Sequence, residues 1–252
     1  MGAMSDTTQV RFGIDFGGTG IKGAAVDLEA GDFASERTKV DTPEASTPEA
    51  VLEIFRSMLD DHPEVTGPVG VTVPGIVRHG VVGLAPNIHP DWQHFDADAF
   101  LTEGLGREVH VVNDADAAGL AEAAVGAAKG RSGVVLVTTL GTGIGSALLN
   151  DGVLVPNVEL GHLEIDGRVA EKWASTKVHK AEGLSYEEWA KRLTVYYRTV
   201  ERLFSPDLFV VGGGVSASFE KFGHLIDIET EIVPATLQNR AGIVGAALLA
   251  DN

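Results

Sequence analysis

The sequence predicts an α/β protein built from two similar lobes, and three observations lead to this fold class. Short apolar runs that are typical of buried strands alternate with helical segments along the chain. The 252 residues include 31 glycines, which is consistent with many tight turns between these segments. A stretch at 18–27 recurs at 141–150, about half a chain length later, with identical residues at five of ten positions. Such a repeat in the same strand context indicates a duplicated architecture.

The expected elements follow from apolar spacing and from turn and cap residues. Each copy of the repeat contains a Gly-Thr-Gly turn between two strands. Thr47 and Pro48 begin a helix whose apolar residues recur on one face through residue 59. The predicted strands lie at 10–15, 21–28, 69–73, 110–114, 134–139 and 208–211. The other predicted helices lie at about 115–128, 186–204 and 242–250.

The composition argues against several classes of function. The chain has no cysteine, which excludes disulfides, cysteine nucleophiles and thiolate metal sites and is compatible with the cytoplasm. The polar N-terminus lacks the apolar segment of a signal peptide, and no apolar run is long enough to span a membrane. A net charge of −17 argues against a nucleic-acid partner, because basic surfaces bind phosphate backbones.

The charge is unevenly distributed along the chain. Between Arg168 and Arg202 there are eight Lys or Arg residues and five Glu residues, a net charge of +3, whereas the remainder carries −20. A solvated helical face is the plainer interpretation of this window. A basic surface that attracts a polyanion is the alternative.

The two Gly-Thr-Gly turns, at 18–20 and 141–143, are the first chemical signal. Glycine lets the backbone approach a ligand closely, so that successive N–H groups can converge on an anion. Neither turn matches a Walker A loop or the dinucleotide-binding fingerprint. One such turn is more often only a turn, but two related turns on two lobes favour a phosphate chain held between them.

Polar side chains at strand ends are the second signal. Asn113 and Asp114 follow an apolar strand and precede a helix, where α/β proteins place catalytic groups; alternatively, one of them only caps the helix. Asp15 has the same position in the first lobe and could position phosphate through Mg²⁺ and its waters. Glu159 and His162 could bind vicinal sugar hydroxyls, although a lone His is more often structural, and the missing cysteines disfavour zinc.

Taken in order, these motifs resemble those of the ROK family of sugar kinases. The resemblance spans nearly the whole chain and implies an actin-like (ribonuclease H-like) fold of two α/β lobes with the active site in the interlobe cleft. It places the lobes at 1–112 and 113–252, with the last helix packing back on the first lobe. The stretches that carry it lie at 15–22, 73–75, 113–114, 140–145, 159–162 and 212–215.

Within this family, the sequence looks most like the polyphosphate glucokinases. The matching stretches lie at 85–88, 164–167, 170–175, 204–208 and 239–247. Most ROK kinases carry a cysteine-rich zinc motif after the Glu-x-Gly-His element, and this chain departs from that pattern. No structural metal is therefore expected, and Glu171 looks like the sugar-binding Glu that normally ends the motif.

The resemblance implies a role for each candidate residue in phosphoryl transfer to the 6-hydroxyl of glucose. Asp114 is the catalytic base. Glucose is bound by Asn87, Asn113, Glu159, His162 and Glu171. The phosphoryl donor, with Mg²⁺, is held by Asp15, Gly17, Gly18, Thr19, Gly20, Lys22, Gly141, Thr142, Gly143, Gly213 and Gly214.

Inorganic polyphosphate is the expected donor, and ATP stays open as a second one. The basic window supports this, with Lys172, Lys177, Lys180, Lys191 and Arg192 as a path and Lys22 as its continuation. The alternatives are a strictly ATP-dependent glucokinase, a non-catalytic ROK-type sugar sensor and an actin-like ATPase. The expected partners are glucose and polyphosphate, without nucleic acid or membrane, and a homodimer is compatible with the sequence.

Overall fold

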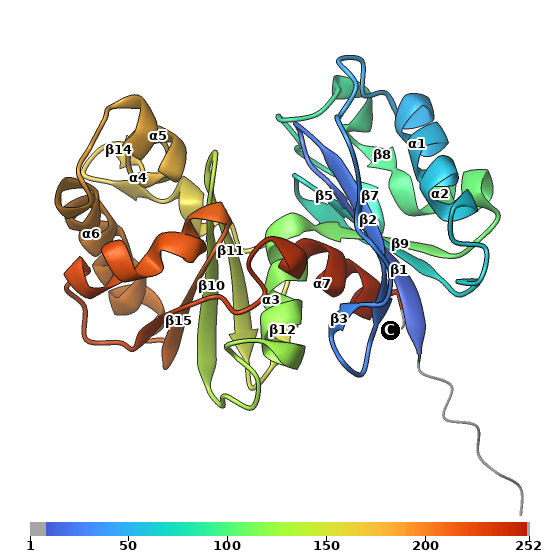
Figure 1. The fold of residues 1–252 in the computed structure, drawn as a ribbon. Helices are drawn as coiled ribbons and strands as arrows, with labels where there is room; N and C mark the ends of the chain where they lie inside the picture. Colours follow the sequence, from blue (N-terminus) through green and yellow to red (C-terminus); the bar gives the residue numbers. More distant parts are fainter. Residues whose placement is uncertain (1–8, 251–252) are drawn as a thin grey trace, which may run out of the picture. The chain divides into compact units, whose positions relative to one another are not determined.

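Two sheets organise the chain in the computed structural model, which describes residues 9–250 (Figure 1). The first sheet has the order β3 (Asp32–Phe33), β2 (Ile21–Asp27), β1 (Val10–Phe16), β5 (Val69–Val73) and β9 (Val109–Asn113), and β4 (Thr38–Val40) also pairs with β2. The second has the order β12 (Val153–Val155), β11 (Ile144–Asn150), β10 (Val134–Leu140), β15 (Leu208–Gly212) and β16 (Ile232–Pro234). The N-terminal stretch, in which no signal peptide is expected, lies mostly outside the described residues.

Both sheets follow one topology. In the first, β1 pairs antiparallel with β2 and parallel with β5, which pairs parallel with β9. In the second, β10 pairs antiparallel with β11 and parallel with β15, which pairs parallel with β16. The duplication predicted from the ten-residue repeat is thus visible in strand order and direction.

The remaining elements connect or cover these sheets. The helices are α1 (Pro48–Asp60), α2 (Ala97–Leu105), α3 (Asp114–Val125), α4 (Glu171–Ala174), α5 (Thr176–Ala181), α6 (Tyr186–Phe204) and α7 (Ala241–Leu249). The 3-10 helices are η1 (Pro90–Trp92), η2 (Leu160–His162), η3 (Gly214–Lys221), η4 (Gly223–Leu225) and η5 (Gln238–Arg240). Two small sheets comprise β6 (Val77–Arg78), β7 (Val81–Val82) and β8 (Phe95–Asp96), and β13 (Glu164–Ile165) and β14 (Arg168–Val169). No helix in the described part is both long and apolar enough to cross a membrane.

The chain forms two compact units. Of the described residues, the first unit comprises 9–117 and 242–250, and the second comprises Ala118–Ala241. The boundary between the units lies between Ala117 and Ala118, after the first turn of α3. The sequence had led us to expect it between residues 112 and 113. The start of α3 stays with the first unit because Asn113 donates to the Gly75 carbonyl and the Ala117 carbonyl packs against Gly245 of α7.

Helices cover both faces of the first sheet. Phe12, Ile14 and Phe16 of β1 belong to the core that also holds the buried face of α1. Gly13 alternates with these residues and therefore faces the other side, where the Ile243 carbonyl of α7 lies directly against it. Gly70 is the register partner of Gly13 on β5 and has the same close contact with Ala246 of α7. Two paired glycines thus let α7 pack with its backbone on the sheet.

The second sheet is also covered on both faces. Leu136 and Phe209 pack in one core with the buried face of α6, which includes the fully buried Trp189. Val135 and Val210 belong to a different core, on the face that carries Ala147. A side chain at Gly119 of α3 would collide with Ala147, so α3 packs closely on this second face. Each unit is therefore a three-layer α/β/α arrangement.

The predicted long elements agree with the structure to within a few residues, with two differences near the site. Strand β9 ends at Asn113, so that Asp114 is the first residue of α3 and not the last residue of the strand. Helix α3 ends at Val125 instead of near 128, because the Glu122 carboxylate accepts a hydrogen bond from the Ala127 N–H (2.7 Å) beyond the helix. The short helices α2, α4 and α5 were not predicted.

Candidate functional site

The predicted site residues divide between the two units, and each group is described within its own unit. The first unit holds Asp15, Gly17, Gly18, Thr19, Gly20, Lys22, Asn87, Asn113 and Asp114. The second holds Gly141, Thr142, Gly143, Glu159, His162, Glu171, Gly213 and Gly214.

The first group gathers at one edge of the first sheet. Strands β1, β5 and β9 are parallel, so their carboxyl ends meet at this edge. The Asn113 side chain at the end of β9 donates to the carbonyl of Gly75, just beyond the end of β5 (3.0 Å). The turn after β1 contacts a further loop, because a Cβ on Gly18 would lie 2.7 Å from the Asn87 carbonyl oxygen. Residues that are far apart in the sequence therefore meet at one place.

The first Gly-Thr-Gly turn is held by its backbone. The Gly17 N–H donates to the Gly20 carbonyl (3.0 Å), and the Thr42 hydroxyl donates to the Gly17 carbonyl (2.6 Å). Gly18 and Thr19 at its tip are exposed. The tip is thus fixed in position while its N–H groups and the Thr19 hydroxyl stay accessible to an anion.

Asp15 and Lys22 form a charged pair next to this turn. They are register partners on β1 and β2, and their side chains make an ion pair of 2.8 Å. The other carboxylate oxygen of Asp15 accepts a hydrogen bond from the Thr72 hydroxyl (3.0 Å). Each oxygen still has a free lone pair, which suits binding of Mg²⁺ through its water shell better than direct ligation. Thr72, fully buried in an otherwise apolar strand, was not predicted as a site residue, although an isolated hydroxyl in such a strand is a usable signal.

Asn113 and Asp114 have different environments at the start of α3. The buried Asn113 side chain caps the helix by accepting from the N–H groups of Ala115 (2.8 Å) and Asp116 (3.0 Å). With its amide also donating to Gly75, one amide hydrogen is left for a ligand. Asn113 is therefore the residue of the pair that caps the helix, which was the alternative to a catalytic role. Asp114 is exposed in the first turn of α3, and its carboxylate accepts from the Ala115 N–H (2.9 Å).

The second Gly-Thr-Gly turn is held from two sides in its own unit. The Gly141 N–H donates to the Gly143 carbonyl (3.0 Å), and the Lys177 N–H of α5 donates to the Gly141 carbonyl (3.0 Å). Gly213, at a φ of +80°, packs against the backbone of Leu140, where a Cβ would lie 2.6 Å from the Leu140 carbonyl oxygen. The loop after β15 therefore lies beside the turn, as the order β10–β15 requires.

Glu171 joins this turn to the predicted sugar-binding residues. Its carboxylate occupies the space that a side chain on Gly143 would need. Glu171 lies 2.7 Å from the Lys172 ammonium and 3.9 Å from Nε2 of His162, and its side chain is 14% exposed. Glu159 precedes η2, and its carbonyl accepts from the His162 N–H (3.1 Å). Turn and sugar candidates thus form one group within the second unit.

The basic window is partly neutralised. Lys172 pairs with Glu171, and Arg192 pairs with Glu182 (2.6 Å). Within residues 9–250, no ion pair is formed by Lys177, Lys180 or Lys191. Lys177 and Lys180 lie on α5, and the Lys177 N–H donates to the Gly141 carbonyl of the second turn. Of the five residues in the predicted basic path, two have their charge neutralised by a neighbouring carboxylate, and three lysines remain to attract a polyanion.

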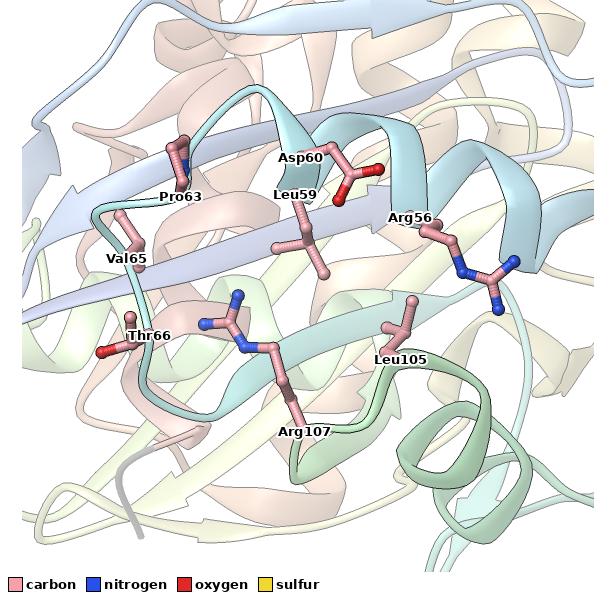
Figure 2. Close-up of a pocket in the computed structure, with 8 residues that line it drawn as sticks. All are labelled: Arg56, Leu59, Asp60, Pro63, Val65, Thr66, Leu105 and Arg107. Atoms are coloured by element: carbon pink, nitrogen blue, oxygen red, sulfur yellow. The ribbon is translucent and has the colours of Figure 1, made fainter.

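A cavity of about 360 Å³ lies elsewhere in the first unit (Figure 2). It contains none of the predicted site residues. Two arginines line it, and both are engaged with backbone carbonyls: Arg56 donates to Gly104 (2.7 Å) and Arg107 donates to Gly67 (3.1 Å). Burial lowers the pKa of Arg107. Nowhere in the described chain do three or more His, Asp or Glu side chains gather to hold a metal ion, and the expectation of no structural metal stays a prediction.

Comparison with known proteins defines the class to which this fold and these motifs belong. The sequence pattern of the ROK family matches residues 11–182, and the chain belongs to this family. It is 46% identical to a polyphosphate glucokinase of Mycobacterium tuberculosis (strain CDC 1551 / Oshkosh), over 94% of this chain and 89% of the relative. It is 29% identical to a glucokinase of Streptomyces coelicolor, over 94% and 96% of the two chains.

Solved structures show the same relationship in three dimensions. The crystal structure of an inorganic polyphosphate/ATP-glucomannokinase from Arthrobacter sp. strain KM is 53% identical, with a TM-score of 0.90 and coverage of 96% of this chain and 98% of that one. A ROK glucokinase from Streptomyces griseus, solved with glucose and AMPPNP, is 26% identical, with a TM-score of 0.81 and coverage of 96% and 99%. The predicted resemblance to the polyphosphate glucokinases and the predicted fold class are confirmed.

Proposed function

We propose that this chain is a sugar kinase that transfers a phosphoryl group from inorganic polyphosphate to the 6-hydroxyl of glucose, with ATP as a second donor. The observation that carries the proposal is the likeness, along nearly the entire chain, to polyphosphate glucokinases and to a polyphosphate/ATP-glucomannokinase. The phosphate-binding turns and the polar residues at the strand ends supply the chemical groups that such a reaction needs.

Asp114 is the proposed general base. Phosphoryl transfer to an alcohol requires a group that accepts the hydroxyl proton as the oxygen attacks. Asp114 suits this role because it is exposed, whereas the neighbouring Asn113 is buried and used as a helix cap. The Ala115 N–H donates to the Asp114 carboxylate and restricts its orientation.

The donor is proposed to bind at the two Gly-Thr-Gly turns. Their exposed N–H groups and threonine hydroxyls can donate to phosphate oxygens, and Lys22 adds positive charge beside the first turn. Mg²⁺, bound with the donor, supplies neutralisation of the phosphate charge. Asp15 is the residue proposed to hold it, through water. Gly213 and Gly214 are proposed to contact the nucleotide when ATP is the donor.

Glucose is proposed to bind through Asn87, Asn113, Glu159, His162 and Glu171. Asn113 has one amide hydrogen left for the sugar, so that it contributes at most one donated hydrogen bond. The surroundings of Glu171 give the strongest support for its role, because its carboxylate packs on Gly143 of the second turn and lies 3.9 Å from Nε2 of His162. A carboxylate in this position can accept hydrogen bonds from sugar hydroxyls.

A coupled assay for glucose 6-phosphate tests the proposal. Polyphosphate and ATP are supplied separately, with glucose and Mg²⁺. We expect turnover with both donors and the larger kcat/KM with polyphosphate. Turnover with ATP alone would make the chain a strictly ATP-dependent glucokinase. Glucose binding without turnover on either donor would indicate a sugar sensor.

We further propose that Lys177 and Lys180 of α5 attract long polyphosphate chains. They lie on α5, whose Lys177 N–H donates to the Gly141 carbonyl of the second turn, and they form no ion pair in the described structure. Both belong to a window of net charge +3 on a chain that is otherwise −20. The double variant Lys177→Met/Lys180→Met should raise the KM for long polyphosphate about tenfold, the effect of about 1.4 kcal/mol of lost attraction. Lys129→Met/Lys221→Met removes the same charge from this unit outside the basic window and should change that KM less than twofold. Equal effects of the two pairs would contradict the path.

The proposal includes a cytoplasmic location, which rests on the sequence alone: a chain without cysteine has no disulfide that an oxidising compartment would maintain.

A further inference from the structure

The helix that carries Glu171 is too short to maintain its own position. Helix α4 has four residues, and Ala170 at its N-cap makes no side-chain capping hydrogen bond. One isolated helical turn is unstable, because the entropy cost of nucleation exceeds the gain from its few hydrogen bonds. The position of Glu171 therefore depends on the contacts that other segments make with α4.

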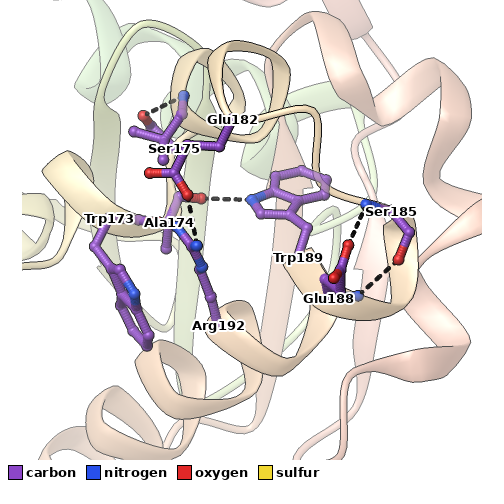
Figure 3. A network of polar contacts seen from close by, with 9 residues as sticks. Trp173, Ala174, Ser175, Glu182, Ser185, Glu188, Trp189 and Arg192 are labelled. Atoms are coloured by element: carbon purple, nitrogen blue, oxygen red, sulfur yellow. Dashed lines mark hydrogen bonds and ion pairs between the residues drawn. The ribbon is translucent and has the colours of Figure 1, made fainter.

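Two side chains of α6 hold the end of α4 (Figure 3). The Trp189 indole N–H donates to the Ala174 carbonyl (2.8 Å), and Arg192 Nη1 donates to the Trp173 carbonyl (2.9 Å). Last-turn carbonyls have no partner within a helix, so these bonds satisfy groups that would otherwise be left unpaired. Trp189 and Ala174 are fully buried.

Arg192 joins three segments. Besides the Trp173 carbonyl, its guanidinium lies 5.8 Å from the Trp173 ring centroid, within cation–π range. Its Nη2 donates to Glu182 at the end of α5 (2.6 Å), and α5 is the helix whose Lys177 N–H holds the second phosphate-binding turn. The Arg192 side chain is only 20% exposed. Removal of this side chain would free the Trp173 carbonyl and leave the Trp189 bond to Ala174 as the hydrogen bond from α6 that still holds the end of α4.

We infer that Arg192 is a positioning residue for glucose binding, which acts by holding α4 so that the Glu171 carboxylate stays beside Gly143 and His162. This inference rests on the proposed role of Glu171 in the sugar site. It also gives Arg192 a role different from that of the unpaired lysines: its charge is used inside the second unit and does not attract the donor.

Arg198 offers a matched control on the same helix. Its guanidinium also pairs with a carboxylate and a carbonyl, both of Asp227, but it does not contact α4. We expect Arg192→Met to weaken glucose binding about tenfold in calorimetry without donor, and to raise the KM for glucose by the same factor while kcat at saturating glucose stays within about twofold. Arg198→Met should leave the glucose Kd within about twofold of wild type. Equal glucose affinities of the two variants would overturn the inference.

A second pair of variants tests whether the effect passes through Glu171. In a Glu171→Gln background, Arg192→Met should weaken glucose binding less than twofold further, because the group that it positions is already altered. A full tenfold loss in that background would overturn the inference. Arg192→Lys keeps one donor and should restore part of the affinity; it serves as the test if Arg192→Met does not fold. If wild-type protein does not bind glucose, or Glu171→Gln binds it normally, the proposed function of the site fails instead.

Discussion

The two hairpins with the repeated Gly-Thr-Gly sequence differ in turn length and in the side chains beside the turn. Four residues lie between the closing pair Phe16 and Ile21, and three lie between Leu140 and Ile144. Next to the pair that closes the first turn, the register partners are Asp15 and Lys22, which form an ion pair. The corresponding partners in the second hairpin are Thr139 and Gly145, which carry no charge. Both hairpins thus carry a glycine turn whose N–H groups can bind phosphate, whereas the charged pair beside the turn exists in one copy only.

The neighbours of the two turns differ in the same way. The first turn packs against the backbone carbonyl of Asn87, a rigid group, whereas the second packs against the carboxylate of Glu171, the end of a flexible side chain. Strand β9 of the first sheet ends at Asn113 and is followed by Asp114, whereas β16, in the same place in the second sheet, ends at Pro234 and is followed by Ala235. Duplication therefore supplied two similar frameworks, and different side chains fit them for different tasks.

The largest expected effect concerns Asp114, the acidic residue that follows β9 in the first unit and has no counterpart after β16 in the second. Asp114→Asn should lower kcat on the order of 10²-fold or more, the usual effect of losing a general base, with glucose affinity nearly unchanged. Steady-state kinetics and calorimetry measure the two quantities. Wild-type turnover at saturating substrates would remove Asp114 from the mechanism and with it the asymmetry between the two units.

The charged pair beside the first turn should have the next largest effect. Lys22→Met leaves a turn flanked by an uncompensated carboxylate, so the KM for both polyphosphate and ATP should rise about tenfold, equivalent to about 1.4 kcal/mol. The Kd for glucose in the absence of donor should not change, which serves as the internal control. If neither donor's KM moves, the difference in charge between the hairpins has no role in donor binding.

A methyl group added to each turn should separate the rigid neighbour from the flexible one. Gly143→Ala should displace the Glu171 carboxylate and weaken glucose binding several-fold, with little change in Tm. Gly18→Ala meets the Asn87 carbonyl oxygen at 2.7 Å, so the loop must shift and the protein should lose about 1–3 kcal/mol of stability. Thermal unfolding and calorimetry on both variants would decide. A loss of stability in Gly143→Ala with normal glucose binding, together with an unchanged Tm in Gly18→Ala, would contradict the difference between the two neighbours.

The smallest expected effect is that of a chelator on stability. Side-chain contacts to α6 hold α4 in the second unit, and the chain has no cysteine, so EDTA should leave the Tm within about 1 °C. Mg²⁺ should still be required for turnover, because it neutralises the charge of the donor. One tightly bound zinc ion per chain, whose removal unfolds the protein, would show that the second unit depends on a metal.

The sequence predicted those parts of the protein that depend on local pattern. The apolar spacing of the helix after Thr47 matches α1, and the Ser185 capping box starts α6 at the predicted residue. The repeat around the two Gly-Thr-Gly turns predicted two hairpins, because glycine-rich turns between two apolar runs favour antiparallel pairing. The turn lengths, which differ by one residue, were left to the structure. Helix α4 was not predicted, because a helix of a single turn has no periodic apolar pattern to detect.

The contacts that bring distant residues together were decided by tertiary structure. Asn87 reaches the first turn, Glu171 reaches the second, and Arg192 reaches α4 across segments that no local pattern connects. The sequence by itself therefore determined the family, the duplicated α/β architecture through its repeat, and the residue types available for the chemistry. Tertiary packing decided which lysines stay unpaired and which arginine holds Glu171, because ion pairs and caps depend on distances between segments that are far apart along the chain.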